Sequence, residues 1–265
     1  MSSTNGTVAR TRATGRTGGV AAVVGRIRPS IRPSPVRGYE RIRGYGIYGL
    51  PFDGGHVLAL RVFPENDFAP YRTVWHRTPD GRWSIYVDGP RHDIACPRYY
   101  GAAADRVASA DVAVTWIGPM ALRVEMDRPE LRLTVELDAP PSARIANAVG
   151  ARVPASLWRL PGVASRAARV ADRVFGVGDV TFVGTVPNGQ HAILLPRRMY
   201  PIATGSATLE GEDLGRPVRS ATNPTIGNVA LPARPMLAVG EAYFEILDPE
   251  EYERTRAELA TALSG

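Results

Sequence analysis

The sequence of 265 residues contains no lysine and only one cysteine, Cys96. A single cysteine excludes an internal disulfide framework and a zinc site built from several thiolates. No apolar run approaches the roughly 18 residues that a membrane-spanning helix needs. The sequence therefore predicts no integral membrane association, and without a recognisable secretory signal we expect a cytoplasmic protein.

All 32 basic residues are arginine, and they are unevenly distributed. Residues 1–37 hold seven arginines and no acidic residue (+7), whereas the remaining 25 arginines face 26 acidic residues (−1). We therefore predict an Arg-rich disordered tail over residues 1–40 and a single domain over 41–265. Because nucleic-acid binders usually carry their positive charge on a folded face, we expect no nucleic-acid partner. The tail is either a solvated extension or is weakly attracted to an anionic surface.

Period-two alternation of apolar residues dominates from residue 40 onward and predicts a mainly β protein. A helix is expected over 161–175, ending at Gly176, and a second after the N-cap Asp248, running to about Leu263. The predicted strands are Val57–Phe63, Arg72–Arg77, Arg82–Asp88, Asp111–Ile117, Met120–Met126, Leu131–Leu137, Asp179–Val186, His191–Leu195, Ile202–Leu209, Pro224–Leu231 and Met236–Ile246.

Two hairpins can be assigned a register. A turn at 127–130 pairs Met126 with Leu131, and a three-residue loop before it, at 117–119, sets Trp116 beside Met120. The dipeptide Asn188-Gly189 is typical of a type I′ turn, which pairs Val186 with His191.

About ten strands, each with one apolar face, must bury that face against one another. We expect an antiparallel meander closed into a lipocalin-like barrel, since closure removes exposed sheet edges. A two-sheet sandwich is the alternative.

The long meander, the segment Gly-Thr-Val-Pro-Asn-Gly-Gln at 184–190, the stretch 207–215 and the C-terminal helix occur together over residues 45–265. In these features the chain resembles lipocalin-like β-barrels of the carotenoid-hydratase/AttH type. The resemblance implies a barrel that binds or transforms apolar polyenes, lipids or polyketide-like molecules.

The densest group of reactive side chains lies between residues 75 and 100. Asp88 and His92 are candidates for acid/base catalysis, and Tyr86 for a hydrogen-bond donor. The alternative is an aromatic core beside an ordinary polar loop. Aromatic side chains suit the wall of an apolar ligand site, and we assign Trp75, Trp83, Trp116 and Phe182 to substrate binding.

His191 shares the predicted strand face of Phe182 and therefore points toward the apolar interior. A histidine there needs a hydrogen-bond partner or a catalytic task, so His191 is the leading catalytic candidate. Scattered histidines and one cysteine give no complete metal-ligand set, and no dinucleotide or phosphate-binding loop is present. We expect no metal or other cofactor.

Three functional hypotheses remain open. The first is a cofactor-independent lyase or isomerase, acting by hydration, isomerisation or cyclisation on an apolar isoprenoid or polyketide-like molecule. The second is a non-catalytic protein that binds a lipid or another apolar ligand. The third is an interaction module with a filled barrel. The sequence does not specify an oligomeric state.

Overall fold

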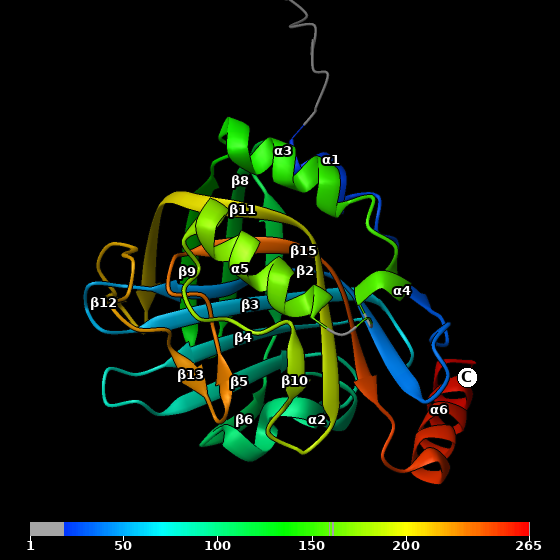
Figure 1. The fold of residues 1–265 in the computed structure, drawn as a ribbon. Coiled ribbons are helices and arrows are strands. Elements are labelled where there is room, and N and C mark those ends of the chain that lie inside the picture. The colour runs from blue at the N-terminus through cyan, green and yellow to red at the C-terminus, as the bar shows by residue number, and fades with distance from the viewer. Residues whose placement is uncertain (1–18, 159, 161, 265) are drawn as a thin grey trace, which may run out of the picture.

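A computed structural model of the chain describes residues 19–264 except 159 and 161. Its centre is one strongly curled, mainly antiparallel sheet (Figure 1). The principal strands follow the order β6-β5-β4-β3-β2-β15-β11-β9-β8-β7. Their bounds are β2 (Tyr39–Pro51), β3 (Val57–Asn66), β4 (Tyr71–Arg77), β5 (Trp83–Asp88), β6 (Arg106–Ser109), β7 (Val112–Trp116), β8 (Ala121–Asp127), β9 (Glu130–Leu137), β11 (His191–Leu209) and β15 (Met236–Glu245).

Short strands and helices surround this sheet. The short strands are β1 (Ser30–Ile31), β10 (Val183–Thr185), β12 (Glu212–Asp213), β13 (Thr225–Ile226) and β14 (Val229–Ala230). The helices are α1 (Val20–Val24), α2 (Pro97–Tyr100), α3 (Pro141–Gly150), α4 (Ala155–Trp158), α5 (Val163–Phe175) and α6 (Pro249–Ser264), with 3-10 turns at His92–Ile94 and Gly101–Ala103.

The sheet curls into a half-barrel whose inner face is filled by apolar side chains. Leu60 of β3, Leu122 of β8 and Leu237 of β15 belong to one buried cluster although their strands lie far apart in the sheet order. The interior of the half-barrel is therefore filled by side chains from its own strands. The mainly β class is confirmed, and buried side chains occupy the inner face of the described strands.

Among the described residues, no hydrogen-bonded ladder closes the sheet into a barrel. The path ends at β6 on one side and β7 on the other. Near this seam the Arg72 guanidinium donates to the Val112 carbonyl, and the Val112 amide donates to the Asp88 carboxylate. These isolated contacts bring the two edges together without a ladder between them.

Ordered structure begins well before the boundary that the sequence suggested. Val20 and Val24 of α1 are buried in the inner cluster, and Ile27 packs with them. β1 then pairs with the end of β3. The prediction of disorder over the whole of residues 1–40 is therefore wrong for residues 20–40. This segment is ordered because its three apolar side chains are buried against the inner cluster, at one end of the half-barrel. Residues 1–18 lie outside the described part.

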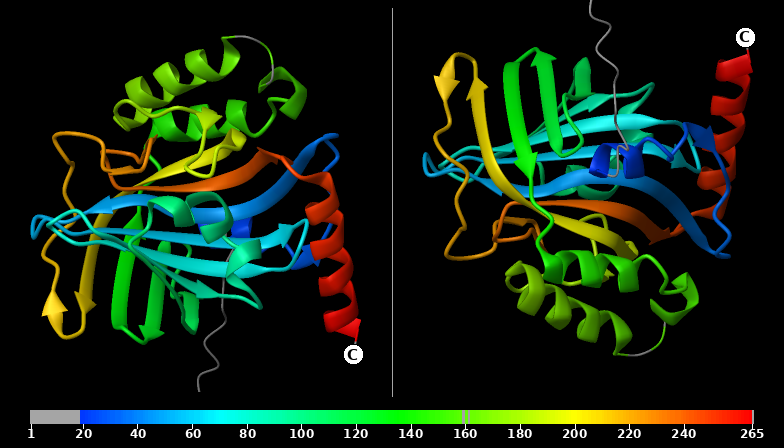
Figure 2. Two further views of the ribbon diagram at one scale, coloured as in Figure 1. Left: turned by 90° about the horizontal axis from the view of Figure 1, so that it is seen from below. Right: turned by 90° about the horizontal axis from the view of Figure 1, so that it is seen from above.

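Helices α3, α4 and α5 pack together on the outer face of the sheet, opposite β7–β9 (Figure 2). We call residues 141–175 the helical cap. The sequence predicted only its last helix, whose end at Gly176 is confirmed by a left-handed backbone there. The C-terminal helix also begins as predicted, since the Asp248 carboxylate accepts from the Glu250 and Glu251 amides.

One predicted hairpin register is confirmed and the others are shifted. Met126 pairs with Leu131 as expected, but Trp116 pairs with Leu122, two residues from the expected partner. At the second hairpin, Thr185 rather than Val186 pairs with His191.

The shift at the second hairpin follows from its turn. Only Gly189 has positive φ, and the Gly189 amide donates to the Val186 carbonyl. Pro187 fixes φ near the value of a type I turn, so the loop has three residues instead of two.

No helix in the described part of the chain is both long enough and apolar enough to cross a bilayer.

Candidate functional site

A small cavity lies between the outer face of the sheet and the segments that cover it. Its volume is about 70 Å³, and its walls are largely apolar. β11 and β15 supply the floor, while residues 180–182 and 229–232 form the cover. The apolar wall residues include Val180, Phe182, Leu194, Leu195, Met199, Val229, Leu231, Met236 and Ala238.

Asn223 holds the two covering segments together. Its side-chain nitrogen donates to the carbonyls of Val177 (2.9 Å) and Leu231 (2.7 Å), and its oxygen accepts from the Asp179 amide. Gly178 sits against this amide with φ +76°, and a Cβ there would lie 2.4 Å from the Asn223 oxygen. Glycine is therefore required where the covering loop approaches Asn223.

Arg61 is the one basic side chain in this lining, and it is 4% exposed. Its Nη1 donates to the carbonyls of Ile47 (2.6 Å) and Leu60 (3.1 Å). The guanidinium carbon lies 4.0 Å from the ring centre of Tyr48 and 4.6 Å from that of Trp75. The two hydrogen bonds satisfy part of the hydrogen-bonding capacity of the guanidinium, and the two aromatic rings pack against it.

Within the described residues, no carboxylate lies within ion-pair distance of Arg61, and no hydrogen-bond acceptor contacts its Nε or Nη2. A buried charge normally has an oppositely charged partner, because removing it from water costs several kcal/mol. The cavity therefore contains a buried cation whose natural complement is an anion.

Two tyrosines of the lining add hydrogen-bond donors. Burial raises the pKa of Tyr48 and of Tyr100, although the charge of Arg61 opposes the shift in both. Both hydroxyls therefore stay protonated at neutral pH, and the described residues give neither one a hydrogen-bond partner. Burial likewise raises the pKa of Cys96, close to this group, so its thiol is not an activated nucleophile.

Glu241 also borders the cavity, but its carboxylate is already paired. Its oxygens lie 2.5 Å from Arg197 Nη2 and 3.3 Å from Arg41 Nε, and the Tyr243 hydroxyl donates to it at 3.2 Å. The lone pairs of this carboxylate are thus already used by Arg197, Arg41 and Tyr243, and it is not free to contact a ligand.

The predicted aromatic residues are divided among several places. Phe182 lines the cavity, and Trp75 stacks on Arg61 behind it. Trp83 packs with Trp75 and Ile85 in a buried cluster on the outer face of the sheet, where its indole donates to the Thr225 carbonyl at 2.8 Å. Trp116 packs against the inner cluster beside Tyr45.

The structure does not bring the four predicted catalytic residues together. Tyr86 is buried in the inner cluster, and Asp88 forms an ion pair with Arg72 at 2.9 Å. His92 Nε2 lies 2.8 Å from the exposed Ser109 hydroxyl. His191 is half-buried, with Nδ1 3.2 Å from the Tyr39 hydroxyl. None of the four lines the cavity.

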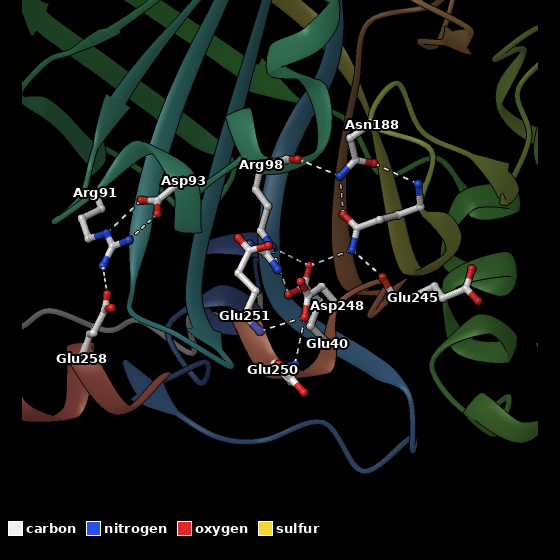
Figure 3. Close-up of polar contacts among 11 residues, drawn as sticks. Glu40, Arg91, Asp93, Arg98, Asn188, Glu245, Asp248, Glu250, Glu251 and Glu258 are labelled. Carbon is white, nitrogen blue, oxygen red and sulfur yellow. Dashed lines mark hydrogen bonds and ion pairs between the residues drawn. The ribbon is translucent and has the colours of Figure 1, made fainter. Parts of the chain in front are cut away.

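The segment 184–190, which carries part of the family resemblance, takes part in a buried polar network (Figure 3). Glu40 accepts from Arg98 Nε at 3.0 Å and from the Gln190 amide at 3.2 Å. Asn188 donates to the Arg98 carbonyl, and Gln190 also donates to the Glu245 carbonyl. Burial raises the pKa of Glu40, against the effect of Arg98. None of the described cavities reaches this network, so we interpret it as a structural junction of β2, α2 and β11.

Sequence reasoning did not single out Arg61 or Tyr48, and it included Tyr100 only as a member of the reactive group at residues 75–100, without a site role. A signal for Arg61 was present, because it interrupts an otherwise apolar strand, Val-Leu-Ala-Leu-Arg-Val-Phe at 57–63.

Within the described residues, no three His, Cys, Asp or Glu side chains are grouped as a metal site would require. Comparison of the chain with protein-family models, curated proteins and solved structures finds no match in any of the three.

Proposed function

We propose that the protein binds a small apolar molecule that carries a carboxylate, in the cavity around Arg61, without altering it chemically. The observation that carries this proposal is the buried guanidinium of Arg61, which faces apolar walls and has no carboxylate partner among the described residues. A bound carboxylate would accept charge-assisted hydrogen bonds from it. The hydroxyls of Tyr48 and Tyr100 offer further donors.

Size and polarity define the ligand class further. The cavity of about 70 Å³ admits only a short chain or a small ring in its buried part. Leu195, Met236 and Ala238 offer apolar contacts to such a group. The family resemblance implies a larger apolar ligand inside a barrel, whereas this cavity favours a smaller one on the outer face.

Binding is favoured over catalysis by the groups around the cavity. His191, Asp88, Tyr86 and His92 lie elsewhere, and Glu241 is held by two arginines. General acid/base catalysis needs a titratable group within hydrogen-bond reach of the substrate. The buried tyrosines remain protonated at neutral pH and suit recognition of an anion better than proton abstraction.

The test titrates the full chain with propanoate, butanoate and hexanoate and with the matching amides. Calorimetry measures affinity, and thermal unfolding measures ligand stabilisation. We expect the carboxylates to bind and the amides not to bind. Arg61→Met should weaken carboxylate binding by on the order of 10- to 100-fold, and Arg61→Lys should recover part of it because the charge remains.

Arg82→Met provides the matched control. Arg82 lies on an exposed turn beside Asp80, outside the cavity, and its loss should leave binding unchanged. Equal affinity for acids and amides would contradict the proposal, as would binding that persists in Arg61→Met.

A further inference from the structure

The helical cap exposes an unusual share of large apolar side chains. Eight such residues are strongly exposed in the described part of the chain, and five of them belong to the cap. Ile145 is 68% exposed, Val149 61% and Val170 54%. The other two are Leu157 and Leu160. A concentration of apolar surface on one element marks an interaction site more often than scattered single residues do.

These side chains border a groove between α3 and α5. The groove has a volume of about 560 Å³ and is lined almost entirely by apolar atoms. Ile145 and Val149 are one helical turn apart on α3, and Val170 and Val174 are one turn apart on α5. Both helices thus present an apolar stripe toward the same opening.

Arginines flank the stripe on α5. Arg166 lies four residues before Val170 and Arg173 three residues after it, so both share its side of the helix. Both are exposed. Their aliphatic stems can lie along the apolar surface while the guanidinium groups reach outward.

The helical cap is positive, as are residues 19–37 with four arginines and no acidic residue (+4), whereas residues 38–140 and 176–265 are negative. Residues 141–175 contain six arginines and one aspartate (+5). Residues 38–140 contain 12 arginines and 14 acids (−2), and residues 176–265 contain seven arginines and 11 acids (−4). The positive charge therefore coincides with the exposed apolar stripe, an arrangement typical of helices that lie in a membrane interface.

We propose that the helical cap is a docking surface for an anionic lipid membrane. Ile145, Val149 and Val170 enter the boundary between headgroups and acyl chains, while Arg166 and Arg173 contact lipid phosphates. A bilayer fits this surface because it accepts apolar side chains and guanidinium groups side by side. The cap lies on the outer face, away from β7–β9, so the rest of the molecule leaves it accessible (Figure 2).

The proposal rests on the cap surface alone and is independent of the ligand proposed for the cavity. The two sites are nevertheless neighbours, because Phe182, Pro196 and Met199 line both the groove and the cavity.

The experiment is flotation of the full chain with two kinds of vesicle, phosphatidylcholine alone and phosphatidylcholine mixed with phosphatidylserine. We expect binding to the mixed vesicles, weakened by added salt. Arg166→Gln and Arg173→Gln should each lower the binding constant by about fivefold. Val170→Ser and Ile145→Ser should also weaken binding, because each removes apolar area from the interface.

Matched controls separate the cap from the rest of the surface. Leu247→Ser changes an exposed apolar residue outside the cap, and Arg123→Gln an exposed arginine outside it, so both should bind as the unaltered chain does. Replacing Arg10, Arg12 and Arg16 with glutamine tests the N-terminal segment, and the cap proposal expects most of the binding to remain.

Three results would overturn the proposal. The first is equal binding to both vesicles, or to neither. The second is loss of binding in the N-terminal variant with full binding in the cap variants. The third is a dimer in light scattering that Ile145→Ser dissociates, because the cap would then contact a second copy of the chain.

Discussion

The inner and outer faces of the sheet bury apolar side chains in different ways. On the inner face, side chains from opposite parts of the half-barrel meet directly, and α1 covers one end. On the outer face, the covering material is irregular: the hairpin β13–β14, the loop before β10 and the helical cap. The cavity around Arg61 and the groove of the cap both occur on this outer face.

This difference follows from the geometry of packing. Strands that curl around a common axis bring regularly alternating side chains together, and such layers interdigitate densely. Loops and short helices laid over a sheet match it less regularly, so they leave cavities and polar groups without partners. A binding site is therefore better sought beneath the covering segments than inside the curl.

The largest effect should come from the inner face. Leu122 is fully buried in the inner cluster. Leu122→Ala should lower the free energy of unfolding by about 2–5 kcal/mol, because the dense surroundings cannot collapse into the void. Urea denaturation measures the change. The control Leu247→Ala, at an exposed position, should change it by less than about 0.5 kcal/mol. A small loss at Leu122 would mean that the inner face is loosely packed.

The sequence predicts much of this inner face but not its central strand. β2 reads Tyr-Glu-Arg-Ile-Arg-Gly-Tyr-Gly-Ile-Tyr-Gly-Leu-Pro, and its three glycines favour loops over strands. The structure gives the reason for two of them. A Cβ on Gly44 would lie 1.9 Å from the Val62 carbonyl oxygen, and one on Gly46 would lie 2.2 Å from that of Leu60. Such close approach depends on tertiary structure, which local propensity cannot reveal.

β11 illustrates a second limit of sequence reasoning. The sequence predicts two strands separated at Pro196 and Pro201, but one strand runs from His191 to Leu209. Its register with β15 shifts between Pro196 and Arg198, at a bulge. A proline at a bulge need not end a strand, because no ladder hydrogen bond is required there. The bulge also places Pro196 in the lining of the cavity.

The candidate site was less predictable than the fold. Phe182 lines the cavity, but the polar residues around it there come from β2, β3 and α2, which are distant in sequence. His191 shares a face of β11 with Ile193 and Leu195, as expected, but it is the first residue of that strand and lies half-buried beside Tyr39. Alternation along the strand therefore gives the face of His191, but it does not reveal what covers that face or that the cavity begins three residues further along β11.

The second prediction concerns the end of the inner face opposite α1. There His56 Nδ1 lies 2.9 Å from His76 Nε2, and Glu212 lies 3.6 Å from His56. Burial, and then the neighbouring His56, lower the pKa of His76 to about 4. Between about pH 6.5 and pH 4, the unfolded chain therefore holds a proton at this position that the folded chain lacks.

Stability should consequently decrease as the pH falls through this range, by on the order of 2–3 kcal/mol from His76 alone. Below about pH 4 the contribution of His76 should no longer change. Urea denaturation at a series of pH values measures the effect, and His76→Gln should flatten this part of the curve. The same acid dependence in His76→Gln would show that other groups cause it.

The third prediction compares one alanine on each face of the sheet. Ala207 is buried in the inner cluster, whereas Ala238 borders the cavity on the outer face. Ala207→Leu should lower the free energy of unfolding by about 1–3 kcal/mol, because a dense core cannot take the added methylenes without strain. Ala238→Leu should cost less than about 1 kcal/mol, because the cavity can accept part of the new side chain. Ala238→Leu should also abolish carboxylate binding, with Arg61 unchanged. If the two substitutions were equally costly, the outer face would be as densely packed as the inner one, and the cavity would offer no room for a ligand.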